Sequence, residues 1–154
     1  MLTYSITEEM LKSFMNDLFL KPVFDVFEVR SVKVRHAVTF EIDGALAGDP
    51  ADSAKTEGYA AWGAVKPHVT SFIKGSAKPA YIKIVFSVPR DMLANILPDA
   101  AAAFINIEYS NGAARMTTAT NRKEFSLDKE TDRAWDTYAR EFFISNGVSC
   151  REES

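Results

Sequence analysis

The chain has 154 residues, of which 47% are hydrophobic and 25% are charged, a composition typical of a globular protein with a sizeable core. Its formal net charge of −3 gives no chain-wide attraction to nucleic acid or to an anionic membrane. The single cysteine, Cys150, excludes an internal disulfide and a zinc site built from cysteines.

No stretch of about 18 consecutive apolar residues occurs, so the sequence predicts no membrane-spanning helix. Near the N-terminus, Glu8, Glu9 and Lys12 interrupt the only apolar stretch, which argues against a signal peptide. We therefore expect a cytoplasmic protein.

The first predicted elements are a short strand at residues 3–6 and a helix after it. Thr7 is a candidate cap of this helix, and Ser5 with Glu8 is an alternative capping box. Apolar residues recur every three or four positions and predict a buried stripe of Met10, Leu11, Phe14, Met15 and Leu18. The predicted water-facing residues are Glu8, Glu9, Lys12, Asn16 and Asp17. Pro22 ends the helix.

Residues 24–42 alternate between apolar and polar side chains, which predicts a β-rich segment. The alternation changes phase at Arg30 and Ser31, which implies a bulge or a tight turn there. A second turn is expected near residues 36–37. Residues 45–58 are rich in Ala, Gly, Asp and Ser and are predicted to form the longest loop.

The apolar spacing of Trp62–Ile73 predicts a second helix. Proline is tolerated near the start of a helix, so Pro67 implies that the helix proper begins near Lys66 or that its first residues form an irregular turn. A basic loop, residues 74–79, joins this helix to a strand at residues 81–86. That strand is apolar on both faces and is predicted to be central.

Pro89 starts a short predicted helix that ends before Pro98. The pair Asn111-Gly112 is the strongest hairpin signal in the chain and joins predicted strands at 104–109 and 113–120.

Residues 124–127 are a candidate for a further strand. Asp128 is the predicted cap of the last helix, which ends at Gly147. The predicted buried stripe of this helix is Ala134, Trp135, Tyr138, Ala139 and Phe142. We expect residues 149–154 to form a loose tail.

These elements predict an α+β fold in which helices cover a mixed, mostly antiparallel sheet. We expect one domain over residues 1–148. An internal duplication is the alternative, because residues 1–44 and 57–127 both follow the order β-α-β-β-β before the helix at 128–146. That element order resembles one domain of the DNA sliding clamps, in which two such units pack together.

Several short motifs occur in a fixed order along most of the chain: Ile42-Asp43-Gly44, Trp62, Pro67, Ile73-Lys74-Gly75, Lys78-Pro79, Lys83-Ile84-Val85, Thr118-Ala119-Thr120, Phe125-Ser126-Leu127-Asp128-Lys129 and Ala134-Trp135-Asp136. Taken together, they resemble a small family of bacterial proteins of unknown function. The family has no assigned activity, so the resemblance implies a unit of this size and no particular chemistry.

The candidate ligand- or anion-binding residues are five basic side chains near the loop after the second helix: Lys66, His68, Lys74, Lys78 and Lys83. The loop lacks the Gly-x-x-x-x-Gly-Lys-Ser/Thr spacing of a phosphate-binding loop, and it follows a helix instead of leading into one. In the alternative interpretation, Lys74 only complements the negative end of that helix.

The sequence predicts no catalytic residue, no metal site and no cofactor. His36 and His68 are the only histidines, and neither has a sequence neighbour that indicates a metal site or a catalytic triad. Asp43, Asp49 and Asp52 lack the spacing of a calcium-binding loop.

The absence of catalytic and phosphate-binding motifs favours a non-enzymatic binding or protein-interaction module. Its expected partner is another protein or a second copy of the chain. The alternative is a nucleic-acid-binding protein with a clamp-like fold that uses the local basic patch. A third hypothesis is an enzyme whose carboxylates meet only in the folded chain, and it rests on the 21 acidic residues.

Overall fold

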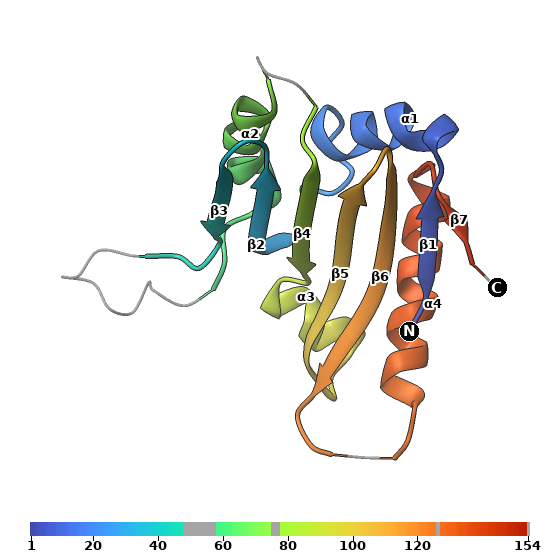
Figure 1. Cartoon of the computed structure of the whole chain (residues 1–154). Helices are drawn as coiled ribbons and strands as arrows, with labels where there is room; N and C mark the ends of the chain where they lie inside the picture. Colours follow the sequence, from blue (N-terminus) through green and yellow to red (C-terminus); the bar gives the residue numbers. More distant parts are fainter. Residues whose placement is uncertain (48–57, 75–77, 126, 154) are drawn as a thin grey trace.

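The computed structural model describes residues 1–47, 58–74, 78–125 and 127–153. Within these residues, seven strands form one sheet: β1 (Thr3–Ile6), β2 (Glu28–Arg35), β3 (Thr39–Asp43), β4 (Tyr81–Ser87), β5 (Ala100–Ser110), β6 (Ala113–Arg122) and β7 (Arg151–Glu152). The helices are α1 (Glu8–Phe19), α2 (Trp62–Ile73), α3 (Arg90–Ile96) and α4 (Glu130–Ser145). The strand order is β3-β2-β4-β5-β6-β1-β7, and all neighbours are antiparallel (Figure 1). The predicted α+β fold is confirmed, with a sheet that is antiparallel throughout.

The sheet has one covered face and one open face. On β4, Ile82, Ile84 and Phe86 are buried, whereas Lys83 between them is exposed. The helices lie on one side of the sheet (Figure 1), and Phe86 of β4 packs against Trp62 of α2 on that side. Successive residues of a strand therefore point alternately into the core and toward solvent. We call the side that carries Lys83 the open face.

Two buried tryptophans anchor helices over the sheet. The indole N–H of Trp62 donates to the carbonyl oxygen of Leu18 at 2.8 Å, and the indole N–H of Trp135 donates to that of Phe104 at 3.0 Å. Each bond gives the polar atom of an indole ring a partner inside the protein. The two largest core side chains can therefore be buried without an unsatisfied N–H group.

Most predicted elements are present. Helix α2 has the predicted bounds, although Pro67 lies inside it and the helix proper begins at Trp62. Strand β4 is central, between β2 and β5. Asn111 and Gly112 have φ values of 52° and 79°, as the tight turn of a hairpin requires.

The predicted bulge is confirmed, because the register of β2 against β4 shifts between Val29 and Ser31. Gly44 allows the chain to pass close beside this bulge. A Cβ atom at this position would lie 1.7 Å from the carbonyl oxygen of Val29, so only glycine allows the approach. The Gly44 N–H donates to the carbonyl oxygen of Arg30 at 3.0 Å, which satisfies a backbone group at the bulge.

Several predictions were wrong. Ala134 was expected in the buried stripe of α4 but is exposed. Asp17 was expected to face water but is 1% exposed. Residues 24–27 form turns that bury Phe24 and Phe27, and the strand begins only at Glu28. The tail is not loose, because β7 pairs with β1 and the N–H of Glu153 donates to the carbonyl oxygen of Thr3 at 2.8 Å.

The remaining differences are at loops and helix ends. Residues 124 and 125 form no strand. Thr7 precedes α1 without a side-chain cap bond. The cap position of α4 is Lys129, and Asp128 contributes by accepting the N–H of Glu130 at 2.9 Å. Asp128 therefore lies one residue before the cap position of α4, instead of occupying it as predicted.

Strands from both candidate halves share the one sheet. β1 lies beside β6, whereas β2 and β3 lie beyond β4 at the far side. The strands β4, β5 and β6 therefore separate the first strand of the chain from the next two.

Candidate binding groove between α1 and α2

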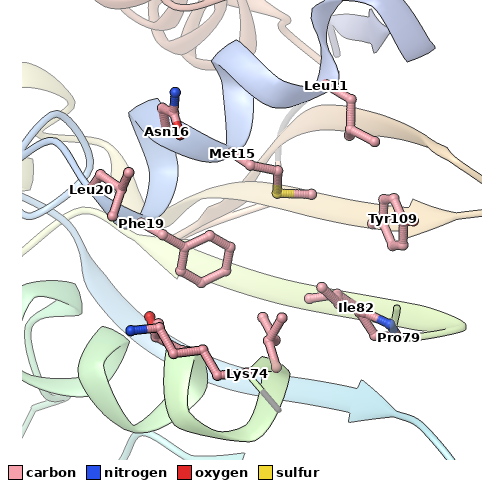
Figure 2. A pocket seen from close by; sticks show the side chains of 11 residues that line it. Leu11, Met15, Asn16, Phe19, Leu20, Lys74, Pro79, Ile82 and Tyr109 are labelled. Atoms are coloured by element: carbon pink, nitrogen blue, oxygen red, sulfur yellow. The ribbon is translucent and has the colours of Figure 1, made fainter. Parts of the chain in front are cut away.

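An apolar groove of about 280 Å³ opens between α1 and α2, above β4 and β5 (Figure 2). It is lined by Leu11, Met15, Asn16, Phe19, Leu20, Thr70, Ile73, Lys74, Pro79, Ile82 and Tyr109. Concave, mainly apolar sites with a few polar groups are the usual form of ligand pockets. Other hollows at the described surface, such as those on the open face, are lined largely by charged and polar side chains.

The spacing of apolar residues in α1 produces one wall of this groove. Phe14 and Leu18 are buried beneath the helix, whereas Leu11, Met15 and Phe19 follow one another at intervals of four residues along its flank. Figure 2 shows these three side chains projecting from α1 into the groove. They are half-buried because α2 does not close over them.

Among the described residues that line the groove, Lys74 is the only charged one, and no acidic side chain accompanies it. Lys78 is exposed and directly precedes Pro79, another lining residue. Thr70 adds little polarity, because its hydroxyl donates to the carbonyl oxygen of Lys66 within α2 at 2.8 Å. The groove therefore suits an apolar group that has a negative charge beside it.

The structure does not bring the five predicted basic residues onto one surface. Lys66 is 16% exposed, with its Nζ atom 2.7 Å from Asp25. His68 is exposed on α2, Lys74 lines the groove, and Lys78 lies nearby. Lys83 lies on the open face, on the other side of the sheet.

Residues that could supply other chemistry are dispersed. No group of three or more His, Cys, Asp or Glu side chains suited to a metal occurs among the described residues. The His36 Nε2 atom lies 3.0 Å from the carbonyl oxygen of Phe72. Asp43 accepts the N–H of Ala45 at 2.9 Å, whereas Asp49 and Asp52 lie outside the described residues.

The Cys150 thiol is poorly suited to act as a nucleophile. Burial, reinforced by the negative charges of Asp17 and Glu152, raises its pKa to about 11. A thiol with this pKa stays protonated at neutral pH, and the reactive form of cysteine is the thiolate.

The open face carries a second concentration of charge. Lys33 and Lys83 are directly opposite each other in the β2–β4 pairing, an arrangement that destabilises a sheet unless negative charge lies nearby. The Lys33 Nζ atom is 3.6 Å from Glu41, and the Arg35 guanidinium lies 5.2 Å from the centre of the Tyr81 ring. A shallow hollow of about 500 Å³ is lined by Lys33, Glu41, Tyr81 and Lys83, among others.

Reasoning from the sequence assigned Leu11 and Met15 to the buried stripe of the first helix and overlooked the groove that they line. The signal that could have indicated it is the second apolar row at positions 11, 15 and 19, beside the row that contains Phe14 and Leu18. Two rows make an apolar face too wide for one contact with the sheet.

Across the described residues, no helix is long and apolar enough to cross a bilayer. No curated protein matches the chain, and no solved structure matches it. The resemblance to a family without assigned activity is confirmed by a family model that matches residues 17–150. The chain belongs to DUF5721, a family of unknown function.

Proposed function

We propose that this protein is a non-enzymatic binding module, and that the groove between α1 and α2 receives an apolar side chain of a partner protein. The observation that supports this proposal is the groove itself, whose lining is apolar except for Asn16, Thr70, Lys74 and the hydroxyl of Tyr109. We place this module in the cytoplasm, where reducing conditions would maintain Cys150 as a free thiol.

The size of the groove suits a single large side chain with part of its neighbour. A dry apolar cavity of about 150 Å³ accommodates benzene, and this groove is about 280 Å³. Full burial of one large apolar side chain contributes about 1.5–3 kcal/mol. Contacts of this size give weak or moderate affinity, and Lys74 would add selectivity for a partner with an acidic residue beside the apolar one.

The fluorescent probe anilinonaphthalene sulfonate tests this proposal, because it combines apolar rings with an anion. We expect its fluorescence to rise with the wild-type protein and to fall strongly with Leu20→Asp, which places a carboxylate at the groove. Leu20 is 75% exposed, so this change spares the core. Ile144→Asp is the matched control, since Ile144 is also 75% exposed and lies on α4. Equal probe binding by Leu20→Asp and wild type would refute the proposal.

Nucleic-acid binding is the second candidate, and it would use Lys33 and Lys83, which lie opposite each other on the open face. Each lysine has a glutamate as its other cross-strand neighbour, Glu41 for Lys33 and Glu108 for Lys83, so a phosphate backbone would have to displace these carboxylates. A labelled single-stranded oligonucleotide should then bind at low salt and dissociate as salt increases. Lys83→Glu should weaken this binding, whereas Lys12→Glu on α1 should not. Absence of binding at low salt eliminates this candidate.

A further inference from the structure

The groove between α1 and α2 offers almost no backbone hydrogen bonds to a partner segment. The strands beneath it, β4 and β5, each pair with a neighbour on both sides, so neither has a free edge. At the rim, the N–H groups of Leu20 and Lys74 donate to carbonyl oxygens within α1 and α2, and Pro79 has no N–H. An extended segment would therefore bury unpaired backbone groups, whereas a helix pairs its own.

The apolar row on α1 has the spacing that receives a helix. Leu11, Met15 and Phe19 are one turn apart, so the row extends about 12 Å along α1, which is the length of roughly two helical turns. Two helices commonly pack by placing such rows of residues four apart between each other. Leu20, which is 75% exposed and also lines the groove, widens this apolar surface.

The charge in the lining of the groove is positive. Lys74 lies in the lining, whereas Glu8 and Glu9 belong to the first turn of α1 and lie outside it. The other acidic residue of α1, Asp17, is enclosed and lies 3.2 Å from the Lys21 Nζ atom. A partner segment with an acidic residue beside its apolar ones is therefore favoured over a basic segment.

We propose that the segment bound in the groove is an amphipathic helix of a partner protein. About two turns of this helix contact the groove, with two apolar residues one turn apart inserted beside Met15 and an acidic residue against Lys74. This inference rests on the proposed function of the groove and names the structure and the charge of the partner segment.

Two libraries of short randomised peptides displayed on phage test the inference. In one library an alanine-rich frame favours a helix, and in the other regularly placed prolines keep the peptide extended. Both are selected on immobilised wild type in the presence of excess soluble Leu20→Asp, which removes peptides that bind elsewhere. We expect enrichment from the helical library alone, with apolar residues one turn apart and Asp or Glu beside them. Enrichment from the extended library alone, or from neither library, would overturn the inference.

Fluorescence anisotropy with an enriched helical peptide then locates the contact. Leu20→Asp should weaken binding by about tenfold or more, from the burial of a large apolar side chain. The control Ile144→Asp should bind like wild type. Lys74→Glu should weaken binding roughly two- to fivefold, and a peptide whose acidic residue is changed to lysine should recover binding to that variant. Unchanged affinity in Leu20→Asp, or no recovery after the charge exchange, would contradict the proposed contact.

The anilinonaphthalene sulfonate assay separates this inference from the proposed function. If the probe binds in a Leu20-dependent way but the helical library yields no binder, the groove retains its proposed function and the helical partner is refuted. If probe binding does not depend on Leu20, both proposals are refuted.

Discussion

Asp17 is a carboxylate enclosed within the protein, with two partners from different parts of the chain. The Lys21 Nζ atom lies 3.2 Å from it, and the backbone N–H of Ser149 donates to its other oxygen at 3.2 Å. A buried charge is stable only when it is paired in this way. Asp17 therefore joins the first helix to the segment that leads into β7.

We predict that Asp17→Ala lowers the free energy of unfolding by about 1–3 kcal/mol, because the N–H of Ser149 loses its acceptor inside the protein. Asp17→Asn keeps an acceptor oxygen and should cost less. Urea unfolding followed by circular dichroism measures both variants. If the two variants were equally stable, the hydrogen bond to Ser149 would not be the source of the effect.

Asp132 makes a pH-dependent contribution to stability. The hydroxyl of Thr120 donates to its carboxylate, and this bond, assisted by the Arg122 guanidinium at 3.4 Å, lowers the pKa of Asp132 below its ordinary value. A carboxyl group with a lowered pKa stabilises the fold above its unfolded-state pKa. That stability is lost as the pH falls through the folded-state pKa.

We therefore predict that Thr120→Val raises the pKa of Asp132 toward its ordinary value and weakens the acid dependence of stability that Asp132 supplies. Carbon-detected NMR titration of the carboxyl group measures the pKa, and unfolding at neutral and acidic pH measures the stability. Thr117→Val, on the same strand, is the control. An unchanged Asp132 titration in Thr120→Val would contradict this assignment.

Among the elements, α2 is unusual because Pro67 lies in its interior. A proline there removes one helical hydrogen bond and crowds the carbonyl group four residues earlier, that of Gly63. Pro67 is exposed, so its ring contributes little to the core. The neighbouring contacts, including the Trp62 indole bond to Leu18, offset this cost.

We predict that Pro67→Ala raises the free energy of unfolding by up to about 3 kcal/mol, because alanine supplies the missing N–H and removes the crowding. Thermal unfolding provides the measurement. Alanine at His68, the next exposed position, is the control and should change little. A less stable Pro67→Ala protein would show that the proline ring makes a favourable contact.

Strand β7 has only two residues, and an ion pair supports it. The Arg140 guanidinium on α4 donates to both Glu152 carboxylate oxygens, at 2.7 and 3.0 Å, and these bonds lower the pKa of Glu152. Both side chains are substantially exposed, so the effect on global stability is small. The pair matters mainly for the position of the strand.

We predict that Arg140→Met accelerates hydrogen exchange at the Glu153 N–H, which pairs with Thr3, and leaves the slowest-exchanging core amides unchanged. Arg133→Met, at an exposed arginine of the same helix, should leave both rates unchanged. Mass spectrometry or NMR of exchanging amides provides the measurement. Equal exchange at Glu153 in both variants would remove the proposed role of the ion pair.

The elements that sequence reasoning predicted well are those with long periodic patterns, such as α2 and the hairpin at Asn111. Strand β7 was missed because two residues have no period, and only the adjacent β1 makes them a strand. Residues 24–27 were misassigned because Phe and Val favour strands, whereas here the turn places Phe24 and Phe27 in the core.

At the scale of the whole molecule, the alternation of apolar residues predicts a sheet with helices over it, but not the order of the strands. Strand order depends on which strands pair with each other, and the pattern of residues within one strand does not specify its partner. The groove was unpredictable for a related reason. It is a gap left by the relative placement of α1 and α2, although the residues that border it, such as Met15, were recognised as apolar.

The pairing of β1 with β6 also has a consequence for biosynthesis. Thr3 lies opposite Thr117, so the first strand leaves the ribosome long before its partner has been translated. Contacts between such distant segments form slowly, because a long loop must close first. During that interval, the β1 residues Tyr4 and Ile6, which are buried in the folded protein, remain available to a chaperone or to a neighbouring nascent chain.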